Sequence, residues 1–324
     1  MKNDLTQKTL YLFCTFLLFA AAKAFSQGQF STNLIMPVAE IEQKLQTGEF
    51  SIYKFGDARF DGDITKRVIL QFDDDKLLQV KWRRAINGAD VFNNRPRYEL
   101  AAYAIQKLFL DEDEYVVPPT CARGWPLKKY RKYDSAVDAT FTKPPIVFFV
   151  LQCWLENVAL AEIHDKARFK KDSLYARHFA NMNIFSYLIY HSDSNRGNAL
   201  ISTLPDQPRV FIVDNGVAFD SEPSNRGTKW REIRVNRLPR KTIERLKSIT
   251  REQLDQTLAV VAEYKIENGG LTPVEFSENF NSKAGVRRKK NRLQMGLNRL
   301  EIKNVHSRLK DLLKRVEKGK FELF

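Results

Sequence analysis

Two polar clusters constrain this chain more than any other feature, because each directly follows an apolar segment and precedes another. The first is HSDSNRGN (residues 191–198), which separates the apolar YLIY from ALI. The second is DNG (residues 214–216), which ends the apolar RVFIV. Polar residues on short connections between buried elements are well placed for binding or catalysis, because the scaffold holds them in position.

A simple turn is the competing interpretation of both clusters. Asn, Asp and Gly favour helix-ending turns, and Asn-Gly favours a tight hairpin. A turn does not explain why Asp193, Arg196 and two asparagines are concentrated in the first cluster. After the second cluster, residues 217–219 lack the alternation expected of a returning strand. Both interpretations stay open for the first cluster, and a site is favoured at the second.

The first half of the chain predicts strands around two helices. Helical spacing is present at residues 36–45, with a proline near the start, and at residues 97–108, where one stripe is apolar. Strands are expected at residues 50–55, 66–72, 77–82, 115–127 and 144–155. The first three are joined by connections short enough for an antiparallel meander.

From about Leu155 onward, the pattern predicts a mostly helical half. Its late helices are expected at residues 251–264 and 292–317. Strands with a helix followed by a run of helices indicate an α+β protein in two lobes. We expect a β-rich lobe over residues 27–150 and a helical lobe over 151–324, with a seam near residues 152–156 and basic helices at the C-terminus.

Residues 1–26 have the pattern of an export signal. Lys2 and Lys8 precede an apolar run, and AKAFSQ offers small residues before Gln27. An uncleaved membrane anchor and a buried helix are the alternatives. Export would permit a disulfide between Cys121 and Cys153, although two buried free thiols fit equally well.

The chain is strongly basic, with a formal net charge of +14. Such a charge favours polyanionic partners or an anionic membrane surface. The densest basic run is VRRKKNR (residues 286–292), for which a solvated helix face is the competing interpretation. It lacks the interleaved aromatic residues of single-strand readers, so nucleic acid is not the favoured partner.

The polar clusters suit phosphoryl transfer, which requires metal ions, a lysine on the phosphates and a carboxylate that orients the acceptor hydroxyl. Asn198 and Asp214 supply hard oxygen atoms of the kind that Mg²⁺ prefers. Lys81 lies in an apolar strand, with Lys76 and Arg83 as competitors for the phosphate-binding role. Glu99 follows in the next helix. Taken singly, Lys81 and Glu99 are better explained as solvated residues.

HSDSNRGN followed by FIVDNGVAF resembles the catalytic and metal-binding loops of atypical kinases. The residues of these motifs are similar to those of type II phosphatidylinositol 4-kinases and the wider phosphatidylinositol 3- and 4-kinase superfamily. Bacterial HipA-like kinases look similar in having Asp and Asn five residues apart. The secretory Golgi casein kinase and four-jointed group also looks similar, on the basis of YELAAYAIQKLF, VVPP and VLQCWL. The resemblance covers roughly residues 81–220 and implies a two-lobed protein-kinase-like fold.

The resemblance also implies roles for individual residues. It makes Asp193 the catalytic aspartate, Asn198 and Asp214 the ligands of Mg²⁺ or Mn²⁺, and Lys81 with Glu99 the pair that positions the phosphates of ATP. The adenine-binding hinge would consist of Gln152, Cys153, Trp154 and Leu155.

The implied activity is ATP-dependent phosphorylation of a hydroxyl on a protein, lipid or glycan. An exported pseudokinase and a polyanion-binding protein without turnover are the alternatives.

The candidate phosphate loop GDARFDG has only Gly56 and Gly62. His191 lies beside the catalytic loop and is a candidate for orienting it.

Overall fold

The computed structural model describes residues 33–57, 63–160, 163–220 and 227–324. Within these ranges, no helix is long and apolar enough to cross a membrane. The expected export signal lies outside the described residues, as does most of the candidate phosphate loop. Cys121 and Cys153 are free thiols, and burial raises the pKa of each to about 12.

The first strands form the antiparallel meander that was predicted. Helix α2 (Val38–Gln46) precedes β1 (Phe50–Phe55), β2 (Thr65–Phe72) and β3 (Leu77–Arg84), which pair in sequence order. After helix α3 (Pro96–Gln106) come β4 (Thr120–Pro126), the short helix α4 (Leu127–Tyr130), β5 (Phe141–Thr142) and β6 (Pro145–Cys153). Strand β6 lies between β3 and β4 in the sheet.

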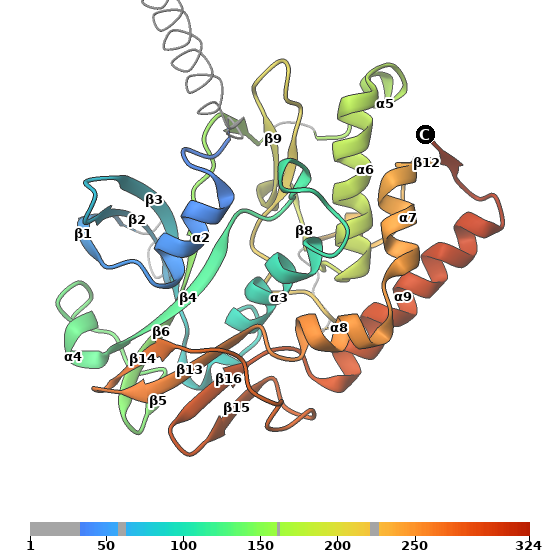
Figure 1. The fold of residues 1–324 in the computed structure, drawn as a ribbon. Coiled ribbons are helices and arrows are strands. Elements are labelled where there is room, and N and C mark those ends of the chain that lie inside the picture. The colour runs from blue at the N-terminus through green and yellow to red at the C-terminus, as the bar shows by residue number, and fades with distance from the viewer. Residues whose placement is uncertain (1–32, 58–62, 161–162, 221–226) are drawn as a thin grey trace, which may run out of the picture.

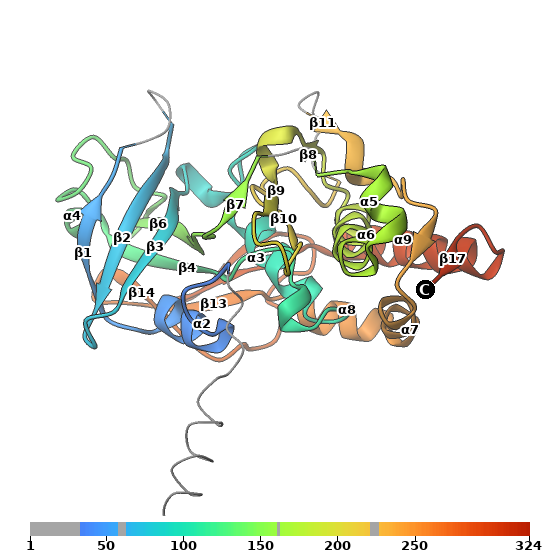
Figure 2. The same cartoon turned by 90° about the horizontal axis from the view of Figure 1, so that it is seen from above.

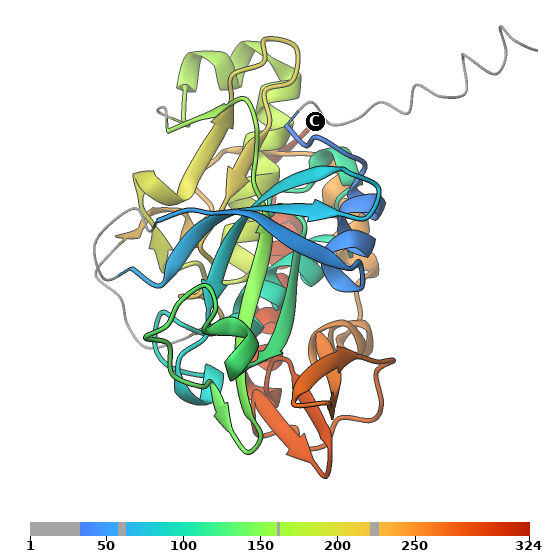
Figure 3. The same cartoon turned by 90° about the vertical axis from the view of Figure 1, so that its left-hand side faces the viewer.

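The second half is helical over much of its length, but residues 262–295 form four strands that were not predicted. Strands β13 (Ala262–Glu267), β14 (Gly270–Pro273), β15 (Val286–Lys289) and β16 (Arg292–Met295) join the same ten-stranded sheet through a β14–β4 contact. Figure 3 shows them in orange and red, continuing the sheet of the N-terminal half. The lobe boundary near residue 150 stays a prediction, but the sheet takes strands from both sides of it.

A local signal explains why β13 and β14 fold back as strands. Glu267 pairs with Gly270, which leaves a two-residue loop of Asn268 and Gly269. Both loop residues have positive φ, 51° and 73°. Asn-Gly with two positive φ angles is the turn that best matches the twist of a hairpin. The helix predicted for residues 251–264 therefore ends as α8 (Arg251–Leu258), and the chain turns into β13.

The remaining helices form the other side of the molecule. They are α5 (Lys166–Lys171), α6 (Ser173–Leu188), α7 (Arg240–Ser248) and α9 (Arg299–Glu317). The late helix was predicted from residue 292, but α9 starts only after Asn298, whose side chain caps it in a capping box with Glu301. Figure 1 shows α9 running along the base of α6 and α7.

Several short elements complete the described chain. Strands β7 (Val158–Ala159), β9 (Ala199–Ser202) and β10 (Val210–Ile212) form one small sheet. Two further pairs are parallel, β8 (Asp193–Ser194) with β11 (Gly227–Thr228) and β12 (Arg237–Leu238) with β17 (Glu322–Leu323).

Helix α3 lies between the large sheet and the helices, as Figure 2 shows. Ten of its 11 residues are buried, so it has no solvent-facing stripe. Its Arg97 donates to both oxygens of Glu301 on α9, at 2.7 and 3.0 Å, and Tyr98 donates to one of them at 2.6 Å. A bidentate arginine–carboxylate pair is among the stronger polar contacts in proteins, so α3 and α9 are tied together.

We predict that Glu301→Ala lowers the free energy of unfolding by about 3–5 kcal/mol, because it leaves Arg97 buried without its main partner and removes the α9 capping box. Denaturant unfolding followed by circular dichroism measures the change. Lys303→Ala, at an exposed position of the same helix, is the control and should change stability little. Equal stability of the two variants would contradict the importance of this contact.

We predict that His178 makes the fold sensitive to acid. Burial, together with the nearby Arg209 and Arg177, lowers the pKa of His178 from 6.5 to about 3. The unfolded chain therefore binds a proton below pH 6.5 that the folded chain does not, and stability falls as the pH drops from 6.5 toward 3. Between pH 7 and pH 5, His178→Gln should lose about 2 kcal/mol less than the unmodified chain. Identical pH profiles in denaturant unfolding would refute this role.

Candidate active site

Strand β3 presents two cations on one face. Side chains alternate along a strand, so Lys81 and Arg83 lie opposite to Val80 and Trp82. Trp82 is fully buried and stacks on Phe149, with ring centroids 4.0 Å apart. The apolar face thus anchors β3 in the sheet, and the opposite face carries Lys81 and Arg83 toward the helical side of the molecule.

Helix α3 brings Glu99 to this face. Lys81 Nζ lies 3.9 Å from Glu99 Oε1, and the Glu99 side chain is only 5% exposed. The other oxygen of Glu99 accepts a hydrogen bond of 3.0 Å from the backbone amide of Asn215. Glu99 therefore contacts both the β3 lysine and the segment that follows β10.

The β9–β10 hairpin places Asn198 beside Asp214. In its register Ala199 pairs with Ile212, and the amide of Val213 donates to the carbonyl of Asn198 at 2.9 Å. Asn198 immediately precedes β9, and Asp214 follows β10 closely. Because antiparallel strands align the start of one with the end of the next, the two candidate metal ligands meet at one end of the hairpin.

Asp193 is held in the same loop cluster. It lies in β8, whose parallel pairing with β11 aligns Asp193 with Gly227. Asn195 Nδ2 donates to Asp193 Oδ1 at 2.9 Å, and Asn198 Nδ2 donates to the Asp193 carbonyl at the same distance. The second bond fixes the plane of the Asn198 amide, and its Oδ1 stays available for another partner.

Asp214 is the most strongly perturbed group of the site. Burial raises the pKa of its carboxyl, but attraction to Lys81 and Arg83 outweighs burial, so the pKa is held well below its usual value. Lys81 Nζ lies 3.4 Å from Asp214 Oδ1, and Arg83 Nη1 donates to the same oxygen. Asp214 also has φ of 62°, an uncommon conformation for a residue other than glycine. Strained backbone of this kind clusters at functional sites.

Buried polar atoms around Asp214 lack hydrogen-bond partners among the described residues. They are Glu99 Oε1, His191 Nδ1 and both polar side-chain atoms of Asn215. Buried polar groups in proteins are normally hydrogen-bonded, so such a concentration calls for an explanation. A polar ligand, an ion or water at this position would satisfy them.

His191 contacts the site through the backbone. Its Nε2 lies 3.4 Å from the carbonyl oxygen of Asp214, and its side chain is fully buried. Burial lowers the pKa of His191, although Asp214 and Asp193 act in the opposite direction. The contact is consistent with the orienting role considered for His191, which stays a prediction.

The donor set fits a hard divalent cation that shares its ligands with a nucleotide. Among the described residues, no group of three or more His, Cys, Asp and Glu side chains could hold a metal alone. Asn198 Oδ1 and the Asp214 carboxylate supply two oxygen ligands on one end of a hairpin. Mg²⁺ in phosphoryl-transfer sites commonly combines one or two protein oxygens with phosphate oxygens and water.

The expected hinge residues lie at the end of β6. Gln152 pairs with Lys81 in the sheet and its Nε2 donates to Thr120 Oγ1 at 2.9 Å. The amides of Cys153 and Trp154 donate to the carbonyls of Pro119 and Gln79, both at 2.9 Å. These two amides could bind adenine only if those bonds broke. Leu155 is buried, and the hinge as a whole stays a prediction.

Two other sequence-derived candidates lie elsewhere. Lys76 pairs with Glu40 and Asp74 near the β2–β3 turn, so it does not compete with Lys81 for the site. The basic run at residues 286–292 covers β15, the following turn and the start of β16, so the competing interpretation as a solvated helix face is wrong. The helix predicted from residue 292 is also wrong for residues 292–295, because β16 pairs with β13 in the sheet.

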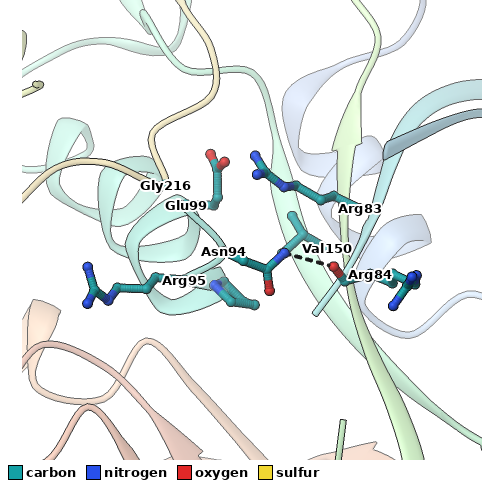
Figure 4. A pocket seen from close by; sticks show the side chains of 8 residues that line it. Arg83, Arg84, Asn94, Arg95, Glu99, Val150 and Gly216 are labelled. Carbon is teal, nitrogen blue, oxygen red and sulfur yellow. Dashed lines mark hydrogen bonds between the residues drawn. The ribbon is translucent and has the colours of Figure 1, made fainter. Parts of the chain in front are cut away.

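A small cavity lies directly behind the site. Figure 4 shows Arg83 extending toward the carboxylate of Glu99, while Arg84 and Arg95 point away on opposite sides. The cavity is lined by Arg83, Arg84, Asn94, Arg95, Pro96, Glu99, Val150 and Gly216. From the sequence, Arg83 was an alternative to Lys81 for the phosphate-binding role. In the structure, both side chains contact Asp214. Lys81 and Arg83 are two residues apart in a strand, and this spacing could have indicated that they share one face.

No protein-family model matches this sequence, and no curated protein sequence matches it. Solved structures do match. Hydra Fam20 with sugar is 13% identical, with 89% of this chain and 92% of that chain covered and a TM-score of 0.52. The Golgi casein kinase with Mn/ADP bound is also 13% identical, with 87% and 76% covered and a TM-score of 0.49.

The similarity to hydra Fam20 concerns the fold, which is α+β and kinase-like, as predicted. Membership of the Golgi casein kinase and four-jointed group stays a prediction. The resemblance to phosphatidylinositol kinases and HipA-like kinases stays a prediction. The chain thus has a kinase-like fold in which Lys81 contacts both Glu99 and Asp214.

We predict that Asp214→Asn destabilises the ligand-free chain by about 1–2 kcal/mol, because Lys81 and Arg83 lose their shared carboxylate. The value is below that of a fully buried pair, since the Asp214 side chain is 32% exposed. Thermal or denaturant unfolding measures the change. Asp193→Asn is the matched control, because Asp193 is bonded to the neutral Asn195 and Asn198. A larger loss for Asp193→Asn would contradict the electrostatic account.

Proposed function

We propose that this chain is a kinase-like phosphotransferase that uses ATP with Mg²⁺ or Mn²⁺ to phosphorylate a hydroxyl. The observation that carries the proposal is the contact of Lys81 with both Glu99 and Asp214, next to Asn198 and Asp193. These residues come from a strand, a helix and two loops that are distant in sequence. Their types match the parts that phosphoryl transfer requires.

Each residue has a distinct role in this proposal. Lys81 binds phosphate oxygens, and Glu99 holds its ammonium group in place at 3.9 Å. Asn198 and Asp214 hold the metal ion, which supplies charge neutralisation on the phosphates. Asp193 orients the acceptor hydroxyl and accepts its proton, with Asn195 fixing one carboxylate oxygen so that the other faces the acceptor. Residues 152–155 are the hinge that would hold the adenine.

The acceptor belongs to the proposal only as a class. A protein, a lipid or a glycan hydroxyl is compatible with Asp193, and an exported location follows from the pattern of residues 1–26. A membrane anchored form is the alternative. The net charge of +14 favours an acidic acceptor or an anionic membrane surface over a neutral one.

An exported pseudokinase is the second candidate, and one contact favours it. Arg83 and Lys81 both occupy Asp214 Oδ1, so a metal ion must share or displace them. Such a site could bind nucleotide without turnover. A polyanion-binding protein without nucleotide chemistry is the third candidate, supported by charge alone.

We predict that the purified protein binds and hydrolyses ATP in the presence of Mg²⁺ or Mn²⁺. Asp214→Ala should abolish metal-dependent binding, and Asp193→Ala should keep binding but lower turnover at least ~100-fold, the usual minimum for a general base. Binding by calorimetry and release of labelled phosphate measure the two steps. Asp206→Ala, at an exposed position of the β9–β10 loop, is the control.

Three results separate the candidates. Binding and turnover in the unmodified protein, with turnover lost in both site variants and binding lost only in Asp214→Ala, support the kinase. Binding without turnover in the unmodified protein indicates the pseudokinase. Absence of nucleotide binding, with salt-sensitive binding to a polyanion that Asp214→Ala leaves unchanged, indicates the polyanion-binding protein.

A further inference from the structure

Strand β3 carries more positive charge into the site than one phosphate-binding lysine explains. Lys81 and Arg83 share one face of the strand, and both contact Asp214 Oδ1. Their side chains are only 18% and 12% exposed. Two cations held this far from solvent on a single oxygen repel one another, and Glu99, 3.9 Å from Lys81, is a second acidic group within reach of them.

The guanidinium of Arg83 is held in place by two hydrogen bonds, but not all of its nitrogen atoms donate one. Nη1 donates to Asp214, Nη2 donates to the carbonyl of Asn93, and Nε has no hydrogen-bond partner within the described residues. Arginine is a planar fork of five donors that suits phosphate oxygens and stays charged at every physiological pH. Figure 4 shows it extending toward Glu99, over the cavity at the site.

The charges around Arg83 indicate which ligand its guanidinium would bind. Asp193, Glu99 and Asp214 are three acidic groups that repel a polyphosphate, and Lys81 by itself offsets just one of them. Arg83 brings a second positive charge within reach of the same carboxylate. An arginine at this position therefore favours the phosphates of a nucleotide, which carry charge, over its uncharged base and sugar.

We propose that Arg83 is a second phosphate-binding residue, which selects nucleoside di- and triphosphates over monophosphates and nucleosides. This inference rests on the proposed function and deepens it. In the bound state, Arg83 donates to a phosphate oxygen in place of Asp214 Oδ1. That exchange frees the Asp214 carboxylate for the metal ion while Nη2 still holds Asn93.

The test compares binding of ADP, AMP and adenosine, with Mn²⁺ present, by the full chain and its Arg83→Met variant. ADP affinity should fall ~10- to 100-fold, which corresponds to the loss of one or two hydrogen bonds to a charged group. Adenosine affinity should stay within about twofold, because adenosine carries no phosphate. Arg83→Lys should recover part of the loss, because it keeps the charge without the fork.

Arg84→Met is the matched control. Arg84 is the next residue of β3 and lines the same cavity, but it points away and lies 3.9 Å from Asp134. Its ADP affinity should equal that of the unmodified chain. Thermal unfolding without ligand shows whether each variant folds, and Arg83→Gln replaces Arg83→Met if the latter does not.

The outcomes separate this inference from the proposed function. If the unmodified chain binds ADP and the Arg83 variant binds it equally well, only the inference is overturned. An equal loss for ADP and adenosine also overturns it, because Arg83 would then merely support the fold of the site. If the unmodified chain binds none of the three ligands, both proposals fail. A loss confined to ADP, with Arg84→Met unchanged, supports the role of Arg83.

Discussion

The shared carboxylate of Asp214 is the interaction on which the site depends. It joins two cations of β3 to the segment after β10, and Glu99 of α3 joins the same segment through the Asn215 amide. A strand, a helix and a hairpin therefore meet at one buried group of charges. Removing Asp214 would leave Lys81 and Arg83 without the carboxylate that they share, which is costly for two largely buried cations.

The rest of the structure keeps these three elements in register. Stacking of Trp82 on Phe149 holds β3 against β6, so the lysine face of β3 cannot rotate. The Arg97–Glu301 pair holds α3 against α9, so Glu99 stays within reach of Lys81. Sites built on rigid elements are positioned more accurately than sites on loops alone. Here the loop residues Asn198 and Asp214 gain that accuracy from the β9–β10 hairpin.

Sequence patterns predicted much of the first half, since strand and helix periods are local. The β1–β3 meander and helix α3 were recognised from alternation and from an apolar stripe. The strands β13–β16 were missed, because AVVAEY and RLQM fit a helical pattern as well as a strand. The dipeptide Asn268-Gly269 could have corrected the helix prediction, because it forms the turn of the β13–β14 hairpin. Asn298, the cap of α9, was a second signal that α9 does not start at residue 292.

By itself, the sequence determined which polar residues follow buried segments and which share a face of β3, because both depend on near neighbours. Only the tertiary structure decided that Lys81 and Arg83 bind one oxygen of Asp214, with separations of 133 and 131 residues. It also decided that strands from both ends of the chain form one sheet. Such contacts depend on how complete elements pack, and local periodicity carries no information about the partner that a face will meet.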